Sequence, residues 1–155
     1  MINSEEKAIE SLLQKGKTKK QVLEALSEQF SKQSLLFHLN NTTLPRYRKQ
    51  YRFFNFSLIA LLLYVTIKKL VIAYVFKAYP TIMLSYLVVP IINIYLLKEI
   101  WKFHKIGYQF LAILSLLALV YEENRVMPDL AIYLTISALS AFLYFKLFPK
   151  QEQLK

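Results

Sequence analysis

Residues 46–69 read RYRKQYRFFNFSLIALLLYVTIKK. The first seven positions carry four cations, which are Arg46, Arg48, Lys49 and Arg52. An uncharged apolar run from Phe53 to Ile67 follows, and Lys68 and Lys69 close it. Cations and aromatic residues on either side of an apolar run are typical of a helix that enters a lipid bilayer. The stretch therefore predicts a first membrane span.

The composition extends this interpretation to the rest of the chain. Hydrophobic residues make up 55% of the 155 positions and charged residues only 19%, and the charges avoid residues 53–67, 78–97 and 106–121. A soluble helical domain would instead place charge along one face of each helix. Only two glycines are present, which disfavours a fold with many tight turns between strands. The sequence predicts an all-α polytopic membrane protein.

The first 41 residues differ from the remainder, because they are polar with an amphipathic pattern. Gly16 is a plausible end for a first helix that starts at Asn3 or Ser4, and Thr18 with Gln21 matches a capping box that starts a second helix. A short third helix is expected from about Ser34. We predict a cytosolic three-helix module over residues 1–41, followed by a basic amphipathic neck over residues 42–52.

Four spans are expected in a transmembrane bundle over residues 53–148, with a cytosolic tail at 149–155. Their ranges are Phe53–Ile67, Pro80–Leu97, Ile106–Tyr121 and Asp129–Phe148. The sequence leaves open whether residues 68–79 extend the first span or lie along the interface.

The distribution of basic residues predicts the orientation. Sixteen of the twenty Lys and Arg fall on one side if the N-terminus is cytoplasmic. Cytoplasmic segments of membrane proteins are enriched in these residues. The interface residues on that side are Arg46, Arg48, Lys49, Arg52, Lys98, Lys102 and Lys105. We therefore predict a multi-pass protein of a cell inner (plasma) membrane with both termini in the cytoplasm.

Three amides are the best candidates for a polar site within the bundle. Asn55, Asn93 and Gln109 each lie one or two turns from a cation at the predicted inner boundary. Pro90 precedes Asn93 by three residues, and it is expected to kink its helix and free the carbonyl of Tyr86. We expect a buried polar layer, which serves interhelical hydrogen bonding or, as the alternative, lines a cavity for a polar headgroup or small ligand.

Other chemistry is poorly represented. The chain has no cysteine and only two histidines, His38 and His104, with no metal-ligating residue at suitable spacing, and His104 is interpreted as an interfacial side chain. No acidic residue lies in the interior of a predicted span, because Asp129 is at the very start of the fourth, and this disfavours a proton-coupled pump. No catalytic motif occurs. We expect no cofactor, no metal and no enzymatic activity.

Three functions remain open. The first is a membrane scaffold or assembly subunit whose N-terminal module binds a cytosolic protein. The second is a small transporter, channel subunit or lipid-binding protein, which requires a cavity that reaches Asn93 and Gln109, or an oligomeric pore. The third is a membrane-bound DNA-binding regulator, disfavoured because residues 1–40 balance six Lys against five Glu. Small residues in the last two spans, such as Ala112, Ser115 and Ser137, suit close helix packing within the chain or in a homo-oligomer.

Overall fold

The computed structural model describes residues 4–154, and all regular structure among them is helical. The short helices are α1 (Ser4–Gln14), α2 (Lys19–Leu26), α3 (Lys32–Asn41) and α4 (Pro45–Gln50). The long ones are α5 (Arg52–Val75), α6 (Pro80–Trp101), α7 (Lys105–Leu117) and α8 (Asp129–Leu147). Short 3-10 turns occur at η1 (Ala118–Val120), η2 (Glu122–Arg125) and η3 (Lys150–Glu152). The expected start at Asn3 and the last tail residue, Lys155, lie outside the described residues.

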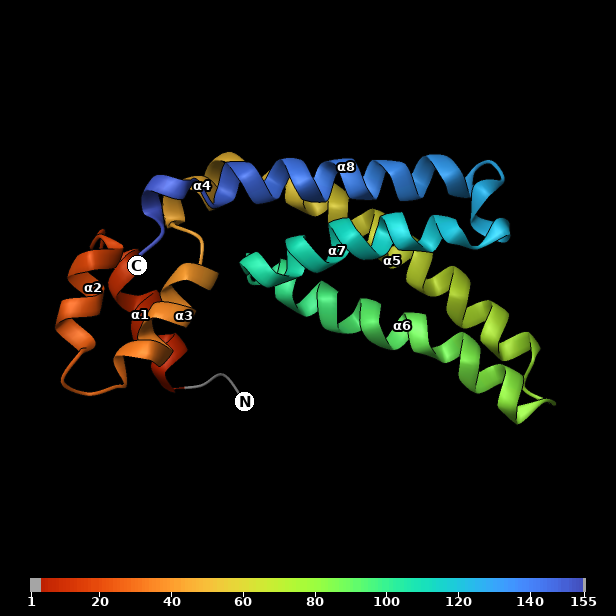
Figure 1. Cartoon of the computed structure of the whole chain (residues 1–155), viewed down its shortest axis with the longest axis horizontal. Helices are drawn as coiled ribbons and strands as arrows, with labels where there is room; N and C mark the ends of the chain where they lie inside the picture. Colours follow the sequence, from red (N-terminus) through yellow and green to blue (C-terminus); the bar gives the residue numbers. More distant parts are fainter. Residues whose placement is uncertain (1–3, 155) are drawn as a thin grey trace.

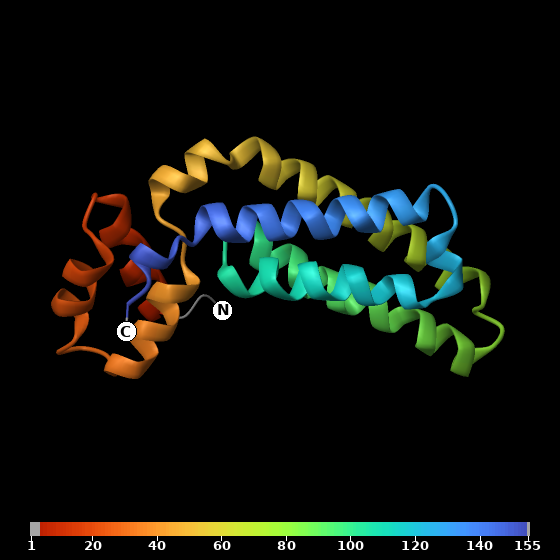
Figure 2. The same ribbon diagram turned by 45° about the horizontal axis from the view of Figure 1, so that its top comes forward.

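The molecule is elongated, with the short helices at one end (Figure 1). Helices α1–α3 form a compact group there, which we call the N-terminal segment (residues 4–41). The hairpins α5–α6 and α7–α8 extend away from it, and the chain end returns beside it (Figures 1 and 2). The inner end of the bundle is the end near this segment, and the opposite end is the outer end.

Local sequence signals explain the N-terminal segment. Thr18 and Gln21 form the capping box at the start of α2. The backbone nitrogen of Thr18 donates to Gln21 Oε1 at 2.9 Å, and the backbone nitrogen of Gln21 donates to Thr18 Oγ1 at 3.3 Å. Gly16, at φ +83°, follows the end of α1 in the left-handed conformation that glycine adopts easily. The three helices share a small apolar core, which consists of Ile9, Leu13, Val22, Leu26, Leu35 and Leu39.

Three helices are long and apolar enough to cross a membrane, judged by length and composition: α5, α6 and α8. Helix α5 extends eight residues beyond the predicted end at Ile67, because two ion pairs neutralise its lysines: Lys68 with Asp129, and Lys69 with Glu123. Residues up to Val75 therefore belong to this helix.

The third predicted span, Ile106–Tyr121, is shorter than expected. Helix α7 ends at Leu117, and its 13 residues rise only about 20 Å against a hydrocarbon core of about 30 Å. The following turn folds back onto the helix end. Asn124 Nδ2 donates to the carbonyl of Ala118 at 2.7 Å, and Arg125 Nε donates to that of Leu119 at 2.7 Å. These bonds satisfy carbonyls that a longer helix would have used.

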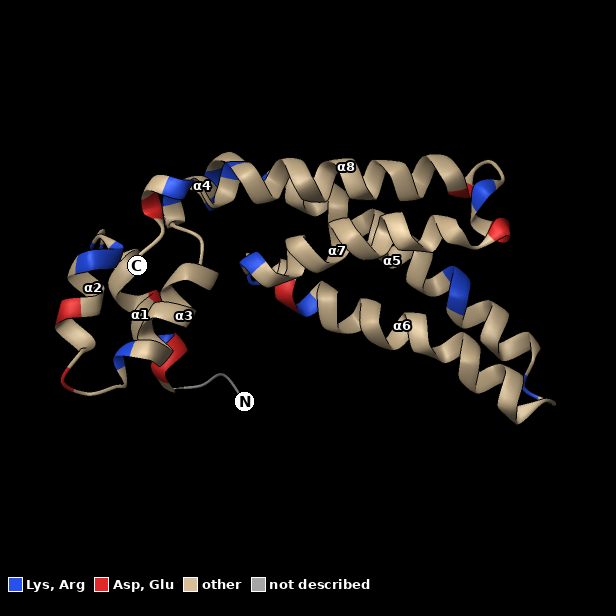
Figure 3. Cartoon of the chain, viewed as in Figure 1, with Lys and Arg blue, Asp and Glu red and all other residues tan. Residues whose placement is uncertain are grey.

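The outward faces of the long helices are apolar. Exposed large hydrophobic side chains occur along all four, for example Phe53, Val71, Ile91, Ile113 and Phe145. Charged residues gather in the N-terminal segment and near the helix ends, with the exception of Lys68 and Lys69 inside α5 (Figure 3). An exposed apolar surface of this extent needs an apolar environment.

Gly107 sets how closely α6 and α7 approach. A Cβ atom at this position would lie 2.9 Å from Glu99 Cβ and 3.1 Å from the backbone nitrogen of Ile100. Neither atom is the far end of a flexible side chain, so a larger residue would force the helices apart.

Replacing Gly107 with alanine should therefore destabilise the fold by about 1–3 kcal/mol through overpacking, despite the better helix propensity of alanine. Gly107→Val should cost more. Thermal unfolding of the full chain in mild detergent, followed by circular dichroism, measures the effect. A melting temperature that is unchanged in both variants would contradict the close approach.

Lys19 is an unusual buried cation at the start of α2, with a residue exposure of 4%. Burial lowers the pKa of its ammonium group from 10.5 to about 8. Glu152 opposes this shift, whereas Lys105 and Arg48 add to it.

The stability of the fold should therefore rise with pH from about 8 to 10.5, because the unfolded chain binds more protons in this window. Between pH 7.5 and 9.5 the gain from Lys19 should be at most about 2 kcal/mol. Urea unfolding of the wild type and Lys19→Met at both pH values measures it as the difference between the two proteins. Lys20→Met, which removes an exposed neighbouring cation, should keep the wild-type dependence.

Candidate functional site

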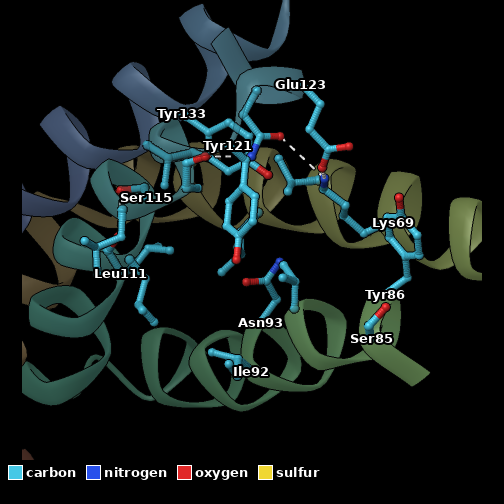
Figure 4. Close-up of a pocket in the computed structure, with 18 of the residues that line it drawn as sticks. Lys69, Ser85, Tyr86, Ile92, Asn93, Leu111, Ser115, Tyr121, Glu123 and Tyr133 are labelled. Atoms are coloured by element: carbon cyan, nitrogen blue, oxygen red, sulfur yellow. Dashed lines mark hydrogen bonds and ion pairs between the residues drawn. The ribbon is translucent and has the colours of Figure 1, made fainter. Parts of the chain in front are cut away.

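The main cavity lies between the α5–α6 hairpin and the α7–α8 hairpin, in the outer part of the bundle (Figure 4). Its volume is about 580 Å³. All four long helices contribute apolar side chains to its walls, for example Leu62, Val89, Leu111 and Ile136. The size falls within the range of ordinary small-molecule pockets.

The mouth of the cavity is mainly apolar, and its exposed polar residues are Ser85 and Glu123. Val89 of α6, Leu117 of α7 and Tyr121 just after α7 line the cavity and are at the same time exposed on the surface of the molecule. The cavity therefore opens between α6 and α7 onto the apolar surface of the bundle.

Asn93 is the most informative polar residue in the cavity wall. It is only 7% exposed, and its Nδ2 finds no acceptor among the described residues. Figure 4 shows its amide pointing from α6 into the cavity, toward the side where Tyr121 lies. A buried amide without a partner costs about 1–3 kcal/mol, so an oxygen atom placed in the cavity would recover this free energy.

Charged and polar groups border the outer end of the cavity. The ammonium group of Lys69 pairs with Glu123 and lies 3.4 Å from Asn124 Oδ1. The hydroxyl of Ser115 is already used, because it donates to the carbonyl of Leu111 at 2.7 Å. Within residues 4–154, Asn93 Nδ2 is thus the buried side-chain donor of the cavity wall that lacks an acceptor.

The other two amides predicted for a common polar layer lie elsewhere. Asn55 is buried near the inner end, where its Oδ1 accepts from the Tyr108 hydroxyl at 2.5 Å and its Nδ2 donates to the carbonyl of Ile100 at 3.3 Å. Gln109 is exposed and donates to the Tyr144 hydroxyl at 3.2 Å. The structure therefore joins no two of the three amides. The spacing between each amide and the nearest cation in the sequence predicted a similar depth for all three. That spacing does not predict the direction in which each side chain points.

Pro90 lies buried within α6, one turn before Asn93, and the helix continues through it. Tyr86, whose carbonyl Pro90 leaves without its usual donor, stacks on Phe76, the residue just after α5, with ring centroids 5.3 Å apart. Tyr86 also lines the cavity.

The inner end carries a second polar cluster that sequence reasoning missed. His104 is 4% exposed, and it contacts Glu99 of α6 through Nδ1 at 2.8 Å and Glu6 of α1 through Nε2 at 3.2 Å. Its interpretation as an interfacial side chain did not foresee these contacts, because the partner carboxylate of Glu6 comes from a segment 98 residues away. No group of three metal-ligating side chains occurs in the part of the chain that the structure describes.

Several predicted basic residues hold the N-terminal segment against the bundle. Lys102 pairs with Glu6 at 3.1 Å, and Arg48 pairs with Glu10 at 2.9 Å. Arg46 pairs with Glu152 of η3, which is outside the N-terminal segment. Lys105 instead lies over the ring of Tyr144, 5.7 Å from its centroid. Lys49, Arg52 and Lys98 are exposed.

The chain was compared with protein families, curated proteins and solved structures, and none of them matches it.

The Tyr108–Asn55 hydrogen bond should contribute measurably to bundle stability. Tyr108→Phe leaves the buried Oδ1 of Asn55 without this donor, so we expect a loss of about 1–3 kcal/mol. Tyr64→Phe, at an exposed tyrosine of α5, is the matched control and should have little effect. Thermal unfolding in detergent compares them, and equal melting temperatures would argue against the bond.

Proposed function

We propose that the protein is an integral membrane protein that binds a lipid-like amphiphile in the cavity between its two long hairpins. The single observation that carries this proposal is the buried, unpartnered amide of Asn93 in an otherwise largely apolar cavity of about 580 Å³. An alkyl chain suits the apolar walls, and a hydroxyl or ester oxygen of the amphiphile would accept from Asn93 Nδ2.

The proposal includes a multi-pass topology, with α7 as a fourth, shorter membrane-embedded helix and both termini in the cytoplasm. The excess of Lys and Arg at the inner end supports this orientation. The apolar mouth between α6 and α7 would then face acyl chains, so the ligand would enter from the bilayer.

No catalytic role is part of the proposal. A hydrogen-bond donor such as Asn93 can orient a ligand, but the cavity wall offers no nucleophile with an adjacent base. Transport of the amphiphile would begin with the same binding step.

A second candidate is the scaffold or assembly function expected from the sequence. It is supported by the attachment of the N-terminal segment to the bundle through Glu6 and Glu10. A cytosolic protein bound to this segment would be held at a fixed position relative to the membrane helices. A pull-down with the full chain in detergent tests it, with a Glu6→Gln/Glu10→Gln variant to loosen the attachment.

Photocrosslinking tests the cavity. The full chain in mild detergent is labelled with a monoacylglycerol that carries a diazirine on its acyl chain. We expect crosslinks to peptides that contain residues 85–93 and 111–118, and Asn93→Leu should weaken binding by about tenfold through the lost hydrogen bond.

Two neighbouring positions on α6 provide a matched pair for this experiment. Val89→Trp places a large ring in the cavity wall and should abolish labelling. Val88→Trp adds the same ring at an exposed neighbour that does not line the cavity, and it should label like the wild type. Equal labelling of the two variants would refute binding in the cavity.

A further inference from the structure

A second hollow, of about 310 Å³, lies at the inner end of the molecule where α4, the start of α5 and the end of α6 meet. We call it the neck cleft. Three of its wall residues are cations and three are aromatic: Arg48, Lys49, Arg52, Phe56, Trp101 and Phe103. It shares no residue with the cavity around Asn93, and its three cations are among the basic interface residues predicted from the sequence.

We propose that the neck cleft binds the phosphate headgroup of an anionic phospholipid. This proposal is independent of the function proposed for the larger cavity.

The charge of the neck cleft supports an anionic ligand. No acidic residue lines it. Arg48 is held in place, because its guanidinium pairs with Glu10 at 2.9 Å and donates to the carbonyl of Thr43 at 3.1 Å. Lys49 and Arg52 form no ion pair within residues 4–154. Two cations are thus left without a counter-charge in one concave site.

The aromatic side of the neck cleft supports a lipid rather than a soluble anion. Trp101 is 64% exposed, and its ring meets Phe56 edge to face with centroids 6.0 Å apart. The guanidinium of Arg52 lies 5.4 Å from the Phe56 ring centroid. Exposed aromatic rings beside cations at the start of an apolar helix are typical of the headgroup level of a membrane. The cations are therefore at the depth where lipid phosphates lie.

The floor of the cleft continues into apolar surface. Ile59 lies in its wall, and one to two turns further along α5 Leu63 and Ile67 are exposed. An acyl chain that follows a bound headgroup would find apolar surface in this direction. A free phosphate would use the cations alone, without the aromatic wall.

Native mass spectrometry of the full chain tests the proposal. The protein is released from non-ionic detergent micelles that contain dioleoyl-phosphatidylglycerol or, separately, dioleoyl-phosphatidylcholine. We expect one tightly retained phosphatidylglycerol and weaker retention of phosphatidylcholine. Lys49→Gln/Arg52→Gln should weaken phosphatidylglycerol binding roughly 25-fold, because each cation near a membrane surface contributes about a fivefold change in affinity.

The matched control removes two charges from the same end but outside the cleft, at Lys98 and Lys146, which are both exposed. Lys98→Gln/Lys146→Gln should change binding far less than the cleft variant. Circular dichroism confirms that both variants stay folded. An equal loss in the two variants would overturn the proposal, because it would show general attraction to a basic surface.

A comparison with a soluble phosphate ester distinguishes a lipid site from a free-phosphate site. Glycerol 3-phosphate should bind much more weakly than phosphatidylglycerol, and Trp101→Ala should weaken only the lipid. Binding of glycerol 3-phosphate as tight as that of the lipid, or equal retention of phosphatidylcholine, would overturn the proposal.

Discussion

The turn between α6 and α7, residues 102–104, is the connection on which the arrangement of the molecule depends. Phe103 adopts φ +57°, and its carbonyl accepts from the hydroxyl of Thr43 at 2.8 Å. His104 lies between the carboxylates of Glu99 and Glu6. The backbone nitrogen of Ile106 donates to Asn41 Oδ1 at 3.0 Å. This short turn thus holds the N-terminal segment in position, precedes the close contact of α6 and α7 at Gly107, and contributes Phe103 to the wall of the neck cleft.

The two ends of the bundle use charge differently. At the outer end, the lysines of α5 pair with Glu123 and Asp129, so that the helix continues past them. At the inner end, acidic residues of the N-terminal segment pair with Lys102 and Arg48, but Lys49 and Arg52 have no ion-pair partner among the described residues. Acidic residues therefore neutralise Lys68 and Lys69 at the outer end of the bundle, whereas the inner end keeps a basic site.

Sequence reasoning predicted the helices better than the sites. The capping box at Thr18, the stop at Gly16 and the long apolar helices follow from local patterns, which report on the nearest turn of chain. The end of α7 was missed because it depends on Asn124 and Arg125 folding back. The cavity around Asn93 depends on how two hairpins diverge, and the partners of His104 come from a distant segment. Neither relation is encoded in the spacing of residues along one helix.

Leu154, which follows the long helices, packs against helices α1–α3. The backbone nitrogen of Leu154 donates to Asn40 Oδ1 at 2.8 Å, its carbonyl accepts from Asn40 Nδ2 at 2.9 Å, and its side chain packs against the small core of α1–α3. During synthesis, helices α1–α3 leave the ribosome more than a hundred residues before Leu154 does. These helices thus complete their packing only after the chain of the long helices has been made.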